Sequence, residues 1–294
     1  MVYIILIAAT LMCSGKALVT KIIGNAAKTP HDVLLLNSAL FLVGAAAAGI
    51  TGAGNLEIMV NVSGVSLLLA AVLSFFLLFT IIMQIYAMNN GPVSLGTLIY
   101  SLGFLVPIFY SAAFLGEDMS VPQCFGVLLI IVSLVMIVPP EKGQKFSFMW
   151  ITFAFLAMLG SGTSAVVQKI HQNTAFKDEL SAFVLYSFLF ASALALIASV
   201  IAKKAFRGER YALFDRKGVI WLILISGMIV GFMNVANTNL AGKLPAIIQF
   251  PVYNIGSMII TAILGKIVFK DNLSKRKLLG FVLGLVAVTI IGLT

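Results

Sequence analysis

The sequence predicts an all-α integral membrane protein whose ten transmembrane helices form two inverted five-helix repeats. Three observations lead to this prediction: the composition, the spacing of the apolar segments, and the similarity between the two halves of the chain. Of the 294 residues, 61% are hydrophobic and only 10% are charged. A water-soluble domain carries charge on about a quarter of its residues. Most of the surface of this chain is therefore expected to face lipid.

Ten apolar segments suit a hydrocarbon core, which a helix of about 20 residues can cross. They are residues 2–23, 31–51, 63–88, 91–115, 121–138, 147–170, 180–201, 218–241, 244–268 and 276–293. Short connections such as "NNGP" and "AGKLP" require neighbouring helices to run antiparallel, and Pro92 and Pro245 suit the first turn of the next helix. In "PHD", His31 and Asp32 are expected to be capping and interface residues rather than catalytic ones.

The basic residues are distributed unequally between the two sides of the predicted membrane protein. Of the 19 Lys and Arg residues, 13 fall in the loops after the first, fifth, seventh and ninth segments, whereas the opposite side has only Lys169, Lys177 and Lys243. The positive-inside rule places the basic loops in the cytoplasm and both termini outside the cell. The expected location is a bacterial cell (plasma) membrane. The net charge of +9 then needs no nucleic-acid partner.

The two halves of the chain resemble each other. "SGKALVTKIIGN" aligns with "GTSAVVQKIHQN", and "FLGEDMSVPQCFGVLL" aligns with "VFKDNLSKRKLLGFVL". The aligned pairs include Lys21 with Lys169, Pro92 with Pro245, Glu117 with Asp271, and Gly126 with Gly280. Residues 1–140 and 146–294 are therefore predicted to be two copies of one five-helix unit. Because five is odd, the second copy enters the membrane inverted.

This pattern is similar to the EamA-type transporters of the drug/metabolite transporter superfamily. The most specific match is "FLGEDMS…QCFGVLLI", and the resemblance covers nearly the whole chain. It implies a carrier that works by alternating access, with a central cavity lined by predicted helices 1, 3, 4, 6, 8 and 9. It also implies substrates such as amino acids, sugars or nucleosides. A multidrug exporter or a lipid flippase on the same fold is the alternative. Cys13 and Ser161 occupy positions where the family often has an aromatic residue.

Polar side chains recur inside the predicted spans, whereas all ten Asp and Glu residues are at loops or helix ends. The absence of a carboxylate argues against an exchanger that works through a buried glutamate. The predicted substrate-binding residues are Lys16, Gln84, Tyr100, Ser164, Asn234, Asn237, Gln249 and Tyr253. The alternative is that the neutral members only form hydrogen bonds between helices.

Lys16 is a charged residue deep in the first predicted span. Helix side chains lean toward the N-terminus, which here points away from the cytoplasmic interface. Lys21 is better placed to reach that interface, so Lys16 is expected to contact an anionic or carbonyl group of the substrate. Extension of the Lys16 side chain to the membrane surface is the alternative.

No catalytic, metal or cofactor site is predicted, so the chain is not expected to be an enzyme. The two histidines, His31 and His171, do not align between the repeats. Cys13 and Cys124 lie in apolar segments and form neither a disulfide framework nor a zinc pattern. The expected partners are a small-molecule substrate and the lipid bilayer. A coupling proton or ion is left open.

Overall fold

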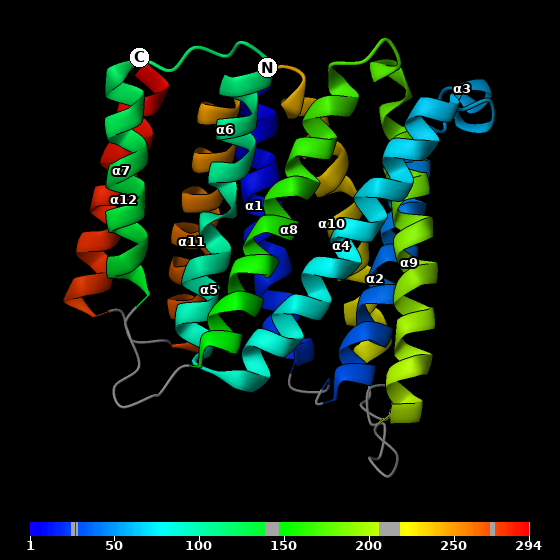
Figure 1. The fold of residues 1–294 in the computed structure, drawn as a ribbon, viewed down its shortest axis with the longest axis horizontal. Coiled ribbons are helices and arrows are strands. Elements are labelled where there is room, and N and C mark those ends of the chain that lie inside the picture. The colour runs from blue at the N-terminus through cyan, green and yellow to red at the C-terminus, as the bar shows by residue number, and fades with distance from the viewer. Residues whose placement is uncertain (25–26, 28, 139–146, 206–217, 271–273, 294) are drawn as a thin grey trace. The chain divides into compact units, whose positions relative to one another are not determined.

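A computed structural model describes residues 1–24, 27, 29–138, 147–205, 218–270 and 274–293. Within these residues every regular element is helical, which confirms the all-α prediction (Figure 1). The elements are α1 (Val2–Gly24), α2 (Pro30–Gly52), α3 (Leu56–Val60), α4 (Gly64–Asn90), α5 (Val93–Ser101), the 3-10 turn η1 (Leu102–Phe104), α6 (Leu105–Phe114), α7 (Val121–Ile137), α8 (Phe148–Gln172), η2 (Lys177–Glu179), α9 (Leu180–Ala205), α10 (Val219–Ala241), α11 (Ala246–Phe269) and α12 (Lys275–Leu293).

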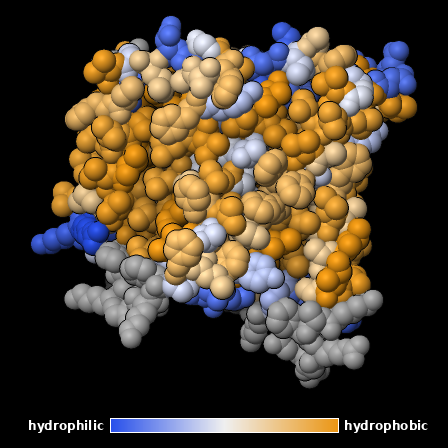
Figure 2. Space-filling model, in the orientation of Figure 1, coloured by the Kyte–Doolittle hydropathy of each residue, from blue (hydrophilic) through white to orange (hydrophobic). Residues whose placement is uncertain are grey.

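The described helices suit a membrane by length and composition. Nine candidate spans are found in the described ranges, and α7 is a shorter apolar helix of 17 residues. Large hydrophobic side chains such as Phe109, Phe148 and Trp221 are mostly exposed. The visible face is mainly hydrophobic, with hydrophilic residues gathered near the helix ends (Figure 2). Exposed apolar surface of this extent is expected where lipid replaces water.

The predicted segment 91–115 contains one candidate span, Leu95–Phe114, with a 3-10 turn within it. It divides into α5, η1 and α6. Pro107 has no N–H to donate to the carbonyl of Gly103, four residues earlier, and this favours a break in the α-helical pattern there. Gly162 of α8 lies so close that an added Cβ would be 2.5 Å from the Gly103 carbonyl oxygen. The sequence prediction also missed the short helix α3.

The chain divides into two compact units. Unit 1 contains residues 1–11, 79–169 and 243–294, and unit 2 contains residues 12–78 and 170–242. The helices α1, α4 and α8 each contribute residues to both units, so the units differ from the sequence repeats.

In unit 1, α7 and α12 lie side by side (Figure 1). Glycine makes the close approach possible, because an added Cβ on Gly126 would be 2.6 Å from Ile291, and one on Gly280 would be 2.9 Å from Ile137. The Ser133 hydroxyl donates to the Gly280 carbonyl at 2.6 Å. Small residues and hydroxyl groups of this kind are the usual means of packing helices within a membrane.

In unit 2, α2 packs against both α9 and α10. Small residues of α2 allow this close packing. Gly44 lies under the Phe188 ring, and Ala47 and Ala48 are fully buried. Ser38 and Ser192 add a reciprocal pair of bonds, since each hydroxyl donates to the other's carbonyl at 2.9 Å.

The start of α2 confirms the capping role predicted for its polar residues. The Thr29 hydroxyl accepts a hydrogen bond from the Asp32 N–H, and the Asp32 carboxylate accepts one from the Thr29 N–H. This reciprocal arrangement satisfies donors at the helix end that otherwise lack partners. His31 contacts the Ser199 carbonyl at 2.8 Å and so joins α2 to α9.

Candidate functional site

Two predicted binding residues of unit 1, Gln84 and Tyr100, line the same small pocket. Residues of α4, α5 and α8 line it, and α8 contributes Ala154 and Ala157. Its cavity volume of about 40 Å³ holds one or two water molecules rather than an organic metabolite. The structure therefore brings Gln84 and Tyr100 together at a narrow, partly apolar site.

The other predicted residues of unit 1 lie on α8 and α11. Gln249 is fully buried, and Tyr253, one turn further along α11, is partly exposed. Asn254 next to it donates to the Ser101 carbonyl at 3.0 Å, which joins α11 to the end of α5. Ser164 is buried and donates to a carbonyl of its own helix. The Asn254 hydrogen bond thus holds α11 against α5. The Ser164 hydroxyl bonds only within its own helix.

Three predicted residues, Lys16, Asn234 and Asn237, belong to unit 2 and are partly buried. Asn234 donates to the Val230 carbonyl of its own helix at 2.9 Å. Among the described residues, Lys16 has neither a hydrogen bond nor an ion pair. Next to it, a Cβ added to Gly15 would meet no described atom within 4 Å. The ammonium of Lys16 is therefore a charge in an apolar helix without a partner in the described part of the chain.

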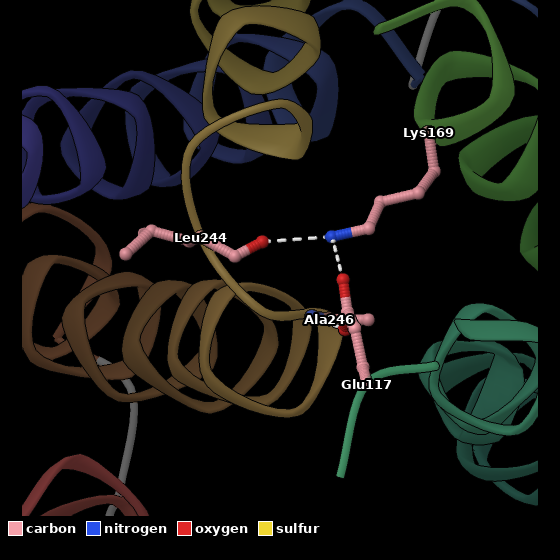
Figure 3. Close-up of polar contacts among 4 residues, drawn as sticks. All are labelled: Glu117, Lys169, Leu244 and Ala246. Atoms are coloured by element: carbon pink, nitrogen blue, oxygen red, sulfur yellow. Dashed lines mark hydrogen bonds and ion pairs between the residues drawn. The ribbon is translucent and has the colours of Figure 1, made fainter. Parts of the chain in front are cut away.

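A buried ion pair in unit 1 was not predicted as part of the site. The Lys169 ammonium lies 2.5 Å from a Glu117 carboxylate oxygen and donates to the Leu244 carbonyl at 2.8 Å (Figure 3). The second Glu117 oxygen accepts a hydrogen bond from the Ala246 N–H at 2.6 Å. The Lys169 side chain is 3% exposed and that of Glu117 is 22% exposed. These four residues, here named the α11 anchor, join the corner after α6, the end of α8 and the start of α11.

Glu117 does not cap α7, the helix that follows it in the chain. That helix has its own capping box of Ser120 and Gln123. Glu117 instead binds the first N–H of α11, a helix that has no side-chain cap and no acid in its first turn. A carboxylate at this place satisfies a free donor and favours the positive end of the helix dipole.

Lys169 differs from its predicted role as a basic residue near a loop. Its side chain is buried and paired, so it does not belong in the count of loop charges. The signal that could have found the pair was available: Lys169 falls within the predicted span 147–170, and Glu117 falls in the most specific family segment. Asp271 aligns with Glu117 in the predicted repeat. It lies outside the described part of the structure, as does the side chain of Lys21.

A second polar cluster lies in unit 2, at the start of α4. The Glu179 carboxylate accepts hydrogen bonds from the Ser63 N–H at 3.1 Å and from its hydroxyl at 2.8 Å. The Ser66 hydroxyl contacts Nε2 of His171 at 3.1 Å, and the fully buried His171 ring stacks on Phe183. These contacts hold the start of α4 against α8 and α9. They do not test the prediction that His171 has no catalytic role.

Replacing Glu179 with alanine is expected to lower the free energy of unfolding by about 1 to 2 kcal/mol, because the start of α4 loses its acceptor. The thermal unfolding midpoint of the purified protein in detergent measures the effect. Asp178→Ala is the matched control, since Asp178 is an exposed acid next to Glu179. Equal midpoints for the two variants would show that the cluster does not support α4.

Within the described residues, no group of three or more His, Cys, Asp or Glu side chains could hold a metal ion. The free Cys13 and Cys124 lie on different helices and are partly buried and exposed, respectively. The polar residues of the two units offer amide, hydroxyl and ammonium groups.

Comparison with known proteins adds a family and a fold. Residues 148–293 match the model of the EamA-like transporter family. A solved structure described only as "Crystal structure of protein" has a TM-score of 0.79 at 15% identity, over 99% of this chain and 97% of the other. A likeness at this identity shows the fold alone. No curated protein matches the sequence.

Proposed function

The chain belongs to the EamA-like transporter family through residues 148–293, and on this premise we propose that it carries a small polar metabolite across the membrane. The proposed mechanism is alternating access by two inverted five-helix repeats, residues 1–140 and 146–294. Amino acids, nucleosides and sugars are the proposed substrate classes. The tenth span of this arrangement is α7, whose 17 residues extend about 26 Å and are at the short end of the range for a membrane crossing.

Contacts between equivalent residues support the repeat arrangement. Ser38 and Ser192 are 154 residues apart, and each hydroxyl donates to the other's carbonyl. A pair of residues that bond to each other in the same way is expected close to a two-fold axis. It joins α2 to α9, the second helices of the two proposed repeats.

A second set of contacts has the same symmetry. Gly126 lies against Ile291, and Gly280 lies against Ile137. Adding 154 to 126 gives 280, and adding 154 to 137 gives 291, so the second contact is the first with the repeats exchanged. These residues join α7 to α12, the last helices of the proposed repeats. Helices that pair with their own equivalents support an inverted two-fold arrangement.

The observation that carries the proposal for the substrate is Lys16. A charged side chain in a membrane span costs free energy unless it has a partner or reaches water. Lys16 has no partner in the described part of the chain and lies beside the open position of Gly15. An anionic or carbonyl group of a bound solute would supply that partner. Amide groups such as Asn234 and Asn237 on α10 suit the remaining polar groups of such a solute.

A thermal-shift screen against amino acids, nucleosides and sugars, followed by Lys16→Ala, tests this proposal. A bound solute is expected to raise the unfolding midpoint, because it binds only the folded state. The shift should disappear in Lys16→Ala and persist in Lys266→Ala, which removes an exposed lysine near the end of α11. The same solutes should be taken up by liposomes that contain the unsubstituted protein.

Two results would count against the proposal in different ways. A full thermal shift in Lys16→Ala would remove Lys16 from the binding site. Strong shifts with lipids, and none with the three metabolite classes, would favour a lipid flippase on the same fold.

We also propose that the protein lies in a bacterial cell membrane with both termini outside. The asymmetry of the loop charges supports this orientation. Several of the loop residues on which it depends lie outside the described ranges, and Lys169 no longer contributes to the opposite side. An epitope tag at either terminus should be accessible to antibody in intact spheroplasts. Accessibility only after permeabilisation would reverse the orientation.

A further inference from the structure

We propose that the α11 anchor is a gate: it holds the start of α11 closed against α8 in the structure seen here, and it opens during transport. The claim that the anchor opens during a transport cycle rests on the proposed function. The closed arrangement rests on contacts within unit 1 alone, between Lys169, Glu117, Leu244 and Ala246. Figure 3 shows these contacts.

The anchor fixes the position of α11 and adds little to the net stability of the fold. Taking two charges out of water costs so much that apolar replacements for a buried pair are often as stable as the pair itself. A buried ion pair is stable only where further hydrogen bonds satisfy the donors and acceptors that the pair itself leaves unpaired. Here Lys169 has the Leu244 carbonyl as a second partner, and Glu117 has the Ala246 N–H. Every contact fixes the start of α11 relative to α8 and to the corner after α6.

All four residues of the anchor belong to unit 1. Lys169 is the last residue of unit 1 before the chain enters unit 2, and Lys243 is the first residue after it returns. The chain makes four such passages, at 11/12, 78/79, 169/170 and 242/243.

The position of α11 also governs two predicted binding residues. Gln249 is three residues after Ala246, on the same face of the helix, and Tyr253 is one turn further along. Gln249 is fully buried while the anchor is formed. Gln249 is the first polar side chain of α11 after Ala246, and opening of the anchor is proposed to expose it. The anchor thus connects an ion pair outside the predicted binding set to exposure of a residue within it.

Cysteine accessibility tests the gate without a substrate. Gln249→Cys is introduced into a background in which Cys13 and Cys124 are replaced by serine, and its reaction with a positively charged, membrane-impermeant methanethiosulfonate is followed. With the anchor intact, the introduced thiol should react slowly. In Glu117→Gln/Lys169→Met the rate should rise by about tenfold or more, as a shift of roughly 1.4 kcal/mol toward the open state would give.

The double substitution removes both charges together, so no charge is left buried without a partner. The amide oxygen of the glutamine introduced by Glu117→Gln can still accept from the Ala246 N–H. Lys169→Met alone is the second variant. A matched reporter, Ile255→Cys, lies on the same helix at a fully buried core position and should stay unreactive throughout. A change at 249 without a change at 255 separates opening of the gate from general loosening.

Two outcomes overturn the inference. One is a Gln249→Cys reaction rate in the double variant equal to that of the intact anchor. The other is an equal rise at both reporter positions, which would assign the anchor a purely structural role. Because neither readout uses a substrate, a failure of metabolite transport leaves this result unaffected. An anchor that fails the accessibility test likewise leaves the uptake experiments valid.

Discussion

Lys169→Met is expected to lower the free energy of unfolding by about 3–5 kcal/mol, among the largest effects of any single substitution in this chain. The substitution removes the ammonium but leaves the Glu117 carboxylate largely buried, with only the Ala246 N–H as a partner. Desolvation of a charge that has lost its partner is the source of the cost. Unfolding in detergent, followed by helical circular dichroism, measures the loss.

A double-mutant cycle decides whether the ion pair itself is responsible. Glu117→Gln/Lys169→Met should recover most of the stability lost in Lys169→Met, because the buried negative charge is then absent as well. The comparison needs Glu117→Gln alone, which leaves Lys169 with the Leu244 carbonyl but without the carboxylate. If the two single effects simply add in the double variant, Lys169 and Glu117 are not coupled and the anchor is not an ion pair in solution.

The stability and accessibility experiments test different properties of the same four residues. A strongly coupled pair could still be a permanent structural feature that never opens. Conversely, an opening gate requires that the closed state be favoured by only a few kcal/mol, since the minor state must be reached during each cycle. A recovery of stability in the double variant together with faster reaction at Gln249→Cys is the combination that a gate requires.

The helices could be predicted from the sequence because hydropathy and chain breaks are local signals. The segment predicted at 31–51 is observed at Pro30–Gly52, with the capping role of Asp32 as expected. That role involves residues only three apart, so the sequence alone contains it. Pro107, whose missing N–H favours the 3-10 turn η1, can be read from the sequence, whereas the approach of Gly162 of α8 to the Gly103 carbonyl, from a position 59 residues away, cannot.

The α11 anchor shows why part of the candidate site could not be predicted. Glu117 and Lys169 are 52 residues apart, and each has an ordinary local interpretation, as an acid at a helix corner and as a lysine near a helix end. Only the fold brings them together at Ala246. Gln84 and Tyr100, by contrast, flank one short connection between spans, so their shared pocket follows from local chain direction. Pairing across distant helices is the information that a single sequence lacks.

Gly231→Leu is expected to lower the free energy of unfolding by about 3 kcal/mol, the upper end of the usual cost of overfilling a packed interface. Gly231 lies on α10, where an added Cβ would overlap the Gly44 carbonyl and would come within 2.5 Å of Ala47 on α2. Backbone atoms cannot move aside as a flexible side chain can, so the two helices must separate. Separation removes the close van der Waals contact on which helix association in a membrane depends.

Gly292→Leu is the matched control for this prediction. It makes the same substitution near the end of α12, where an added Cβ would meet no described atom within 4 Å. Leucine has a higher helix propensity than glycine, so this variant should be neutral or more stable by up to about 1 kcal/mol. Opposite signs for the two variants would locate the effect in the contact between α2 and α10. Equal losses would mean that any enlarged glycine destabilises these helices and that the small residues of α2 are not required for its packing.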